Sequence, residues 1–152
     1  MVMISTYPDA PYTNPLEVGA KFLDFVMETL NKHQIIFQPY TSRQMQYYKG
    51  ESVQGWEVKL DNRFTDTGRL SIEIAEKTAR GNSNWIPSGI YRNDNTCGYI
   101  QGNYQYFYFF HKDDLINLHK TRRYIEDEYN GTIRKYYLPI SDADKYGIKI
   151  TP

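Results

Sequence analysis

Two short segments near the middle of the chain alternate between two kinds of side chain, strictly between apolar and polar in the first and with Ala75 on the polar face in the second. They span residues 55–61 and 70–76, and a turn signal, Asp66-Thr67-Gly68, lies between them. Because successive side chains of a β-strand point to opposite faces, each segment predicts a strand with one apolar and one polar face. The spacing favours pairing of the two strands in a hairpin. The apolar positions are Trp56, Val58 and Leu60 in the first strand and Leu70, Ile72 and Ile74 in the second.

Helical spacing of apolar residues predicts a helix over residues 15–32, with Asn14 as its N-cap and Pro15 at the first helical position. A second helix is expected over 111–120. The aromatic run 104–110 predicts a strand that is buried on both faces. Other short strands are expected at 34–40, 88–92, 99–100, 134–140 and 146–150. This order of elements predicts a single α/β (α+β) domain over residues 1–152, with a central mixed sheet flanked by helices.

The polar face of the predicted hairpin concentrates acidic residues around one lysine. If the apolar faces of both strands face one core, the carboxylates and the lysine must share the other face, because a slip of one residue would bury them. Carboxylate oxygens suit Mg²⁺ or Mn²⁺, and a neighbouring lysine can orient water or stabilise negative charge. A solvated charged face on an ordinary amphipathic hairpin is the alternative interpretation. The residues concerned are Glu57, Lys59, Asp61 and Glu73, with Glu51 at the approach to the first strand.

The run 50–61, which contains Glu57-Val58-Lys59, resembles the core of the PD-(D/E)XK nucleases, in which an acidic residue precedes a strand bearing (Asp/Glu)-x-Lys. The pieces 67–73 and 87–91 look like those of small phage-associated members, so the resemblance covers about residues 45–115. It implies a restriction-endonuclease-like sheet, dependence on Mg²⁺ or Mn²⁺, and a nucleic-acid substrate.

Two alignments to this family remain open. In the first, Glu51 is the leading acid and Glu57 and Lys59 form the second half of the motif. In the second, Asp61 leads, Glu73 is the second acid, and Lys59 serves from the other strand. A helical glutamate often completes such sites, and Glu17 is the candidate here.

The resemblance therefore predicts a metal-dependent endonuclease that acts on DNA, which would cut both strands most readily as a homodimer. The expected catalytic residues are Glu57, Lys59, Glu51, Asp61 and Glu73, and the expected metal ligands are Glu51, Glu57 and Asp61. The expected contacts to nucleic acid are Arg63, Arg69, Lys77 and Arg80. The alternative is a phage accessory protein, a non-catalytic module on the same fold that binds nucleic acid or protein. Its contact surfaces would be the tyrosine pairs Tyr47-Tyr48 and Tyr136-Tyr137.

Charge and cysteine content narrow these expectations. With 18 basic and 18 acidic residues the formal net charge is zero, so any contact with DNA must come from local patches. The lone cysteine, Cys97, excludes an intramolecular disulfide and favours a reducing compartment, which predicts a cytoplasmic protein. No apolar run is long enough for a membrane span, and the N-terminal residues do not have the pattern of a signal peptide. The spacing of Cys97 and the three histidines does not suggest a zinc site.

Overall fold

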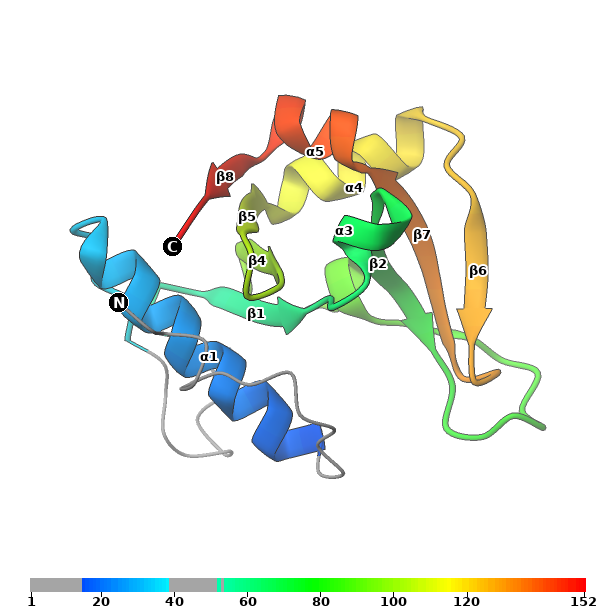
Figure 1. The fold of residues 1–152 in the computed structure, drawn as a ribbon. Helices are drawn as coiled ribbons and strands as arrows, with labels where there is room; N and C mark the ends of the chain where they lie inside the picture. Colours follow the sequence, from blue (N-terminus) through cyan, green and yellow to red (C-terminus); the bar gives the residue numbers. More distant parts are fainter. Residues whose placement is uncertain (1–14, 39–51, 53) are drawn as a thin grey trace.

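The strands divide between two four-stranded sheets in the computed structural model, which describes residues 15–38, 52 and 54–152 (Figure 1). The first sheet has the order β1-β4-β5-β8, with β1 at Trp56–Leu60, β4 at Gly98–Gly102, β5 at Phe107–His111 and β8 at Ile148–Ile150. The second has the order β3-β2-β7-β6, with β3 at Ile86–Pro87, β2 at Arg69–Glu76, β7 at Ile133–Pro139 and β6 at Glu126–Tyr129. The helices are α1 (Pro15–Lys32), α3 (Phe64–Thr67), α4 (Lys112–Thr121) and α5 (Ile140–Tyr146), with a 3₁₀ turn at Gly89–Tyr91. The predicted α+β class is confirmed.

Helix α1 covers one face of the first sheet. Its apolar stripe, which includes the buried Phe22, Val26 and Leu30, packs in one cluster with the apolar side chains of β1. The amphipathic spacing of residues 15–32 produces this contact, because residues three and four apart lie on the same side of a helix. The predicted helix is thus confirmed from Pro15 to Lys32.

Strand β5 connects the two cores of the molecule. Phe107 belongs to the cluster beneath α1, whereas Tyr108 and Phe110 belong to the cluster that includes Leu70 and Ile72 of β2. Alternation along one aromatic strand therefore places rings in both cores. The predicted strand buried on both faces is confirmed over 107–110, but residues 104–106 belong to the turn that follows β4.

The predicted hairpin of 55–61 and 70–76 is wrong, although both segments are strands. Strand β1 pairs in parallel with β4, and β2 pairs antiparallel with β3 and β7. After β1 the chain forms α3 and then Gly68, whose φ of 75° ends that helix, before it enters the second sheet. The apolar faces of β1 and β2 consequently pack in different cores, so they share no common face. The structure therefore has two sheets where the sequence predicted one central mixed sheet.

Other departures are local. The expected strand at 88–92 is a 3₁₀ turn, and residues 35–38 form no strand, while 39 and 40 lie outside the described residues. Helix α5 and strand β6 were not expected from the sequence. Within the described residues, no helix has both the length and the apolar character needed to cross a membrane.

The 3₁₀ turn packs closely on β2 at Gly89. Gly89 has a φ of 57°, and a Cβ added there would overlap the backbone oxygen of Glu73. We expect Gly89→Ala to lower the free energy of unfolding by about 2–4 kcal/mol, because it adds both backbone strain and a steric clash. Urea denaturation with Gly19→Ala as the control measures this.

Gly19 lies in α1, and a Cβ added there would meet nothing within 4 Å beyond the helix's own backbone, so its replacement by alanine should raise stability by about 0.5–1 kcal/mol. Unchanged stability in Gly89→Ala would contradict the close packing of the turn on β2.

Candidate functional site between the two sheets

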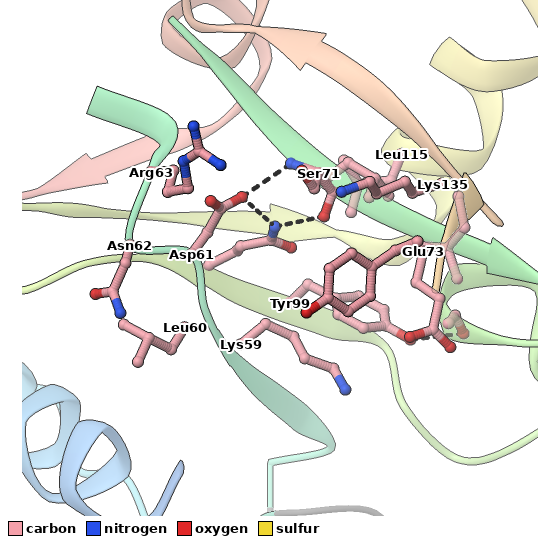
Figure 2. Close-up of a pocket in the computed structure, with 15 residues that line it drawn as sticks. Lys59, Leu60, Asp61, Asn62, Arg63, Ser71, Glu73, Tyr99, Leu115 and Lys135 are labelled. Carbon is pink, nitrogen blue, oxygen red and sulfur yellow. Dashed lines mark hydrogen bonds between the residues drawn. The ribbon is translucent and has the colours of Figure 1, made fainter. Parts of the chain in front are cut away.

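One carboxylate joins the two sheets. Asp61 follows β1, and its Oδ2 accepts hydrogen bonds from the Ser71 backbone N–H at 2.9 Å and from the Gln101 Nε2 at 3.2 Å (Figure 2). The same Gln101 nitrogen donates to the Ser71 carbonyl oxygen at 2.7 Å. Gln101 is only 5% exposed, so its amide group and Asp61 satisfy each other and the backbone of β2. We call these three residues the Asp61 junction.

A pocket of about 440 Å³ opens beside the junction. It lies between the polar face of the first sheet and β2, and residues of several strands line it (Figure 2). Its charged and polar lining residues are Lys59, Asp61, Asn62 and Arg63 from β1 and the turn after it, Ser71 and Glu73 from β2, Tyr99 and Gln101 from β4, and Tyr129 and Lys135 from β6 and β7. Acidic and basic groups distant in sequence thus meet in one cavity.

Lys59 is paired with an acid on its own strand. Its Nζ lies 3.2 Å from Glu57 Oε1, and the two side chains are 44% and 19% exposed. Residues two apart on a strand share a face, so the pairing follows from the Glu-x-Lys spacing. Glu57 is not among the residues that line the pocket. It lies behind the pocket, in contact with the lining residue Lys59.

Tyr99 fixes the position of the 3₁₀ turn at the pocket. Its hydroxyl donates to the carbonyl oxygen of Gly89 at 2.8 Å. Burial and, next, the charge of neighbouring Glu57 raise the pKa of Tyr99 well above that of free tyrosine. The phenol therefore stays neutral and keeps donating its proton at any ordinary pH.

The structure brings together three of the five expected catalytic residues. Lys59, Asp61 and Glu73 all line the pocket, but they come from two sheets rather than from one hairpin face. Glu57 lies beside the pocket, and Glu51 falls outside the described residues. Glu17 is exposed in the first turn of α1 and does not line the pocket.

The four basic residues expected to contact nucleic acid are spread over two regions. Arg63 lines the pocket, and Arg69 lies in β2 with its guanidinium 3.7 Å from the centre of the Tyr137 ring. Lys77 and Arg80 lie in the loop after β2, where they donate hydrogen bonds to the carbonyl oxygens of Asn82 and Asn130. Only the first two are therefore near the pocket or on the sheet that forms its wall.

Several pocket residues were missed from the sequence. Gln101 interrupts an apolar strand, and a polar side chain at a buried strand position was the one available signal for it. Lys135 lies opposite Glu73 on β7, and Tyr129 lies near the end of the neighbouring β6. These two residues reach the pocket because strands distant in sequence pair with each other. The alternation of side chains along one segment does not predict which strands pair.

Two carboxylates are available for a divalent metal ion. The Glu73 carboxylate has no hydrogen-bond or ion-pair partner among the described residues, and Asp61 uses only its Oδ2 in the junction. No group of three or more His, Cys, Asp and Glu side chains that could hold a metal lies within the described ranges. Mg²⁺ commonly uses one or two carboxylates, with water and substrate phosphate as the remaining ligands. Asp61 and Glu73 supply oxygen donors of the kind that this mode of binding uses.

Comparison of the chain with protein-family models, with curated proteins and with solved structures finds no match. Membership of the PD-(D/E)XK superfamily therefore stays a prediction. The fold and the pocket define an α+β protein with a site between two sheets, in which carboxylates, cations and a buried amide meet.

The Asp61 junction is testable by removing its amide group. We expect Gln101→Leu to lower the free energy of unfolding by about 1–3 kcal/mol, because the Ser71 carbonyl and Asp61 lose a buried donor. Chemical denaturation of the wild type and the variant measures the loss. Gln105→Leu is the control, since Gln105 is exposed and, toward the residues that the structure describes, only its backbone N–H makes a hydrogen bond. Equal effects of the two substitutions would show that the junction contributes no more than an exposed glutamine.

Proposed function

We propose that this protein is a metal-dependent endonuclease that hydrolyses phosphodiester bonds in DNA at the pocket between its two sheets. One observation carries the proposal: Lys59, Asp61 and Glu73 line the same pocket although they lie on different sheets. These are the residues of the alignment in which Asp61 is the leading acid and Glu73 the second. Phosphodiester hydrolysis needs this combination of carboxylates for metal and a cation close to the developing charge.

Asp61 and Glu73 are the residues that would hold Mg²⁺ or Mn²⁺. A bound divalent ion would lower the pKa of a coordinated water and offset negative charge on the phosphate. Gln101 and the Ser71 N–H hold one oxygen of Asp61 at fixed positions, so the carboxylate is oriented before any ligand arrives. That orientation reduces the entropy cost of binding.

Lys59 supplies the positive charge. Its ammonium group can donate hydrogen bonds to the attacking water or to a phosphate oxygen, and pairing with Glu57 at 3.2 Å restricts where it lies. Arg63 and Lys135 also line the pocket and would contact flanking phosphates. The net neutral chain would thus bind DNA through a local group of cations.

A second candidate function is a non-catalytic nucleic-acid-binding module. The observation in its favour is that the Asp61 carboxylate already has a structural partner in each sheet, so the junction would be needed without any chemistry. The cations of the pocket would then bind phosphates alone. In either case we propose that the protein acts in the cytoplasm, and cutting both strands of a duplex would be served by a homodimer.

Plasmid cleavage tests the nuclease directly. Purified wild-type protein should nick or linearise supercoiled DNA in Mg²⁺ or Mn²⁺, and EDTA should abolish the cutting. Lys59→Ala should lower the rate by about 10²–10⁴-fold, the range for loss of a group that assists proton transfer. Lys145→Ala, which removes an exposed lysine of α5, is the matched control and should cut like the wild type. Cutting that survives in Lys59→Ala would reject this site.

Metal binding separates the two candidate functions. Mn²⁺ titrated into the wild type should bind, as followed by electron paramagnetic resonance, and Glu73→Gln should weaken that binding by about tenfold, since one of few carboxylate ligands is lost. Glu76→Gln is the control on the same strand, because Glu76 is half-exposed and paired with Arg92 instead. If neither variant changes Mn²⁺ binding, the binding module is the better description.

A further inference from the structure

One face of the second sheet carries a row of cations and tyrosine rings. Cross-strand partners share a face, and the register pairs Ser71 with Tyr137 and Glu73 with Lys135. The same face continues onto β6, which lies beside β7 and ends at Tyr129 (Figure 1). We call Arg69, Tyr137, Lys135 and Tyr129 the aromatic strip.

Cations and rings alternate along the aromatic strip. The Arg69 guanidinium lies 3.7 Å from the centre of the Tyr137 ring. The Lys135 ammonium lies between two rings, 5.2 Å from the centre of Tyr137 and 5.4 Å from that of Tyr129. Tyr129 is 55% exposed, so its ring offers surface to a ligand.

The two faces of this sheet differ in their surroundings. Tyr136 and Leu138 alternate with the strip residues of β7 and are completely buried in the core with Leu70 and Ile72. Packing therefore explains Tyr136 but leaves Tyr137 and Tyr129 on the other side. Of the expected contact pair Tyr136-Tyr137, only Tyr137 lies on the strip, and Tyr47-Tyr48 lies outside the described residues.

The aromatic strip continues into the pocket. Lys135 and Tyr129 both line the cavity that contains Asp61 and Glu73. A polymer bound along the strip would therefore extend into the pocket, toward Asp61 and Glu73. Acids on this face are Glu73, Asp127 and Glu76, which pairs across the strands with Ile133. Asp127 accepts a hydrogen bond from the Tyr137 hydroxyl at 3.0 Å, which fixes that ring.

We propose that the aromatic strip binds an unpaired strand of DNA and delivers it to the pocket. Exposed rings stack on bases, whatever their sequence, and neighbouring cations contact the backbone; proteins that hold single strands combine these two features. A base would stack on Tyr129, and the phosphate between two nucleotides would contact Lys135. In an intact duplex the base faces are covered by their neighbours, so rings on a sheet surface would gain little from it. This inference rests on the proposed function, since it takes the pocket to be a DNA site.

Fluorescence anisotropy tests the strip with a labelled 15-nucleotide oligothymidine and a duplex of the same length, in EDTA so that no cutting occurs. The wild type should bind the single strand more tightly. Tyr129→Ala should weaken that binding by about tenfold, because base–aromatic stacking is lost, whereas Tyr129→Phe should stay within about twofold. Lys135→Gln should reduce the salt dependence by about one phosphate contact.

Ile148→Ala is the control for loss of an exposed apolar side chain, since Ile148 is 60% exposed on β8 in the other sheet. If the wild type and Tyr129→Ala bind the oligothymidine equally well, or if the wild type prefers the duplex, the proposed role of the aromatic strip is wrong.

Plasmid cleavage by the same preparations separates this proposal from the proposed nuclease activity. If the protein cuts the plasmid but Tyr129→Ala does not weaken binding of the oligothymidine, the nuclease proposal stands and the role of the aromatic strip is wrong. If Tyr129→Ala weakens binding but the wild type does not cut the plasmid, the strip binds single-stranded DNA and the nuclease proposal is wrong.

Discussion

The hydrogen bonds of Asp61 to the Ser71 N–H and the Gln101 amide are the interaction on which the site depends. Strands β1 and β2 share no ladder, so the sheets meet here through side chains. The junction places β2, with Glu73, against the polar face of β1, with Lys59. Without it the backbone groups of Ser71 would face the cavity without partners, which would destabilise the contact of β2 with β1.

Packing around the first sheet explains why the junction lies where it does. Helix α1 covers one face of that sheet, and the second sheet covers part of the other through the rings of β5. Tyr108 and Phe110 hold the sheets together on the β5 side, and polar groups remain on the β1 side. The cavity therefore opens at β1, where two surfaces meet without enough apolar area to fill the space between them.

The sequence predicted local structure well and long-range pairing poorly. Alternation gave β1 and β2, and helical spacing gave α1, because each depends on residues that are close in sequence. The pairing of β1 with β4, across about 40 residues, has no local signal, so the two amphipathic strands were joined in a hairpin that does not exist. Strand β6, with the sequence Glu-Asp-Glu-Tyr, is exposed throughout and shows no alternation at all.

The sequence predicted some of the residues that line the pocket, but not the strand pairing that brings them together. Lys59, Asp61 and Glu73 were expected to meet because alternation puts each on a polar face, and that part of the reasoning holds for β1 and β2 separately. Gln101 and Lys135 were missed because they reach the pocket through strands whose neighbours only the folded chain defines. The polar faces of β1 and β2 were thus predicted correctly, whereas the prediction that both strands belong to one sheet was wrong.

Paramagnetic broadening by Mn²⁺ in a ¹H–¹⁵N spectrum of the wild-type protein tests the central claim most directly. If the pocket between the sheets holds the metal, small additions of Mn²⁺ should broaden the amide signals of Asp61, Ser71, Glu73 and Gln101 first. The signals of α5 should persist longest, and Mg²⁺ in excess should restore the broadened ones. Broadening that begins at the exposed acids Glu126–Glu128 of β6 instead, or that spreads evenly over the spectrum, would contradict a metal site at the junction of the two sheets.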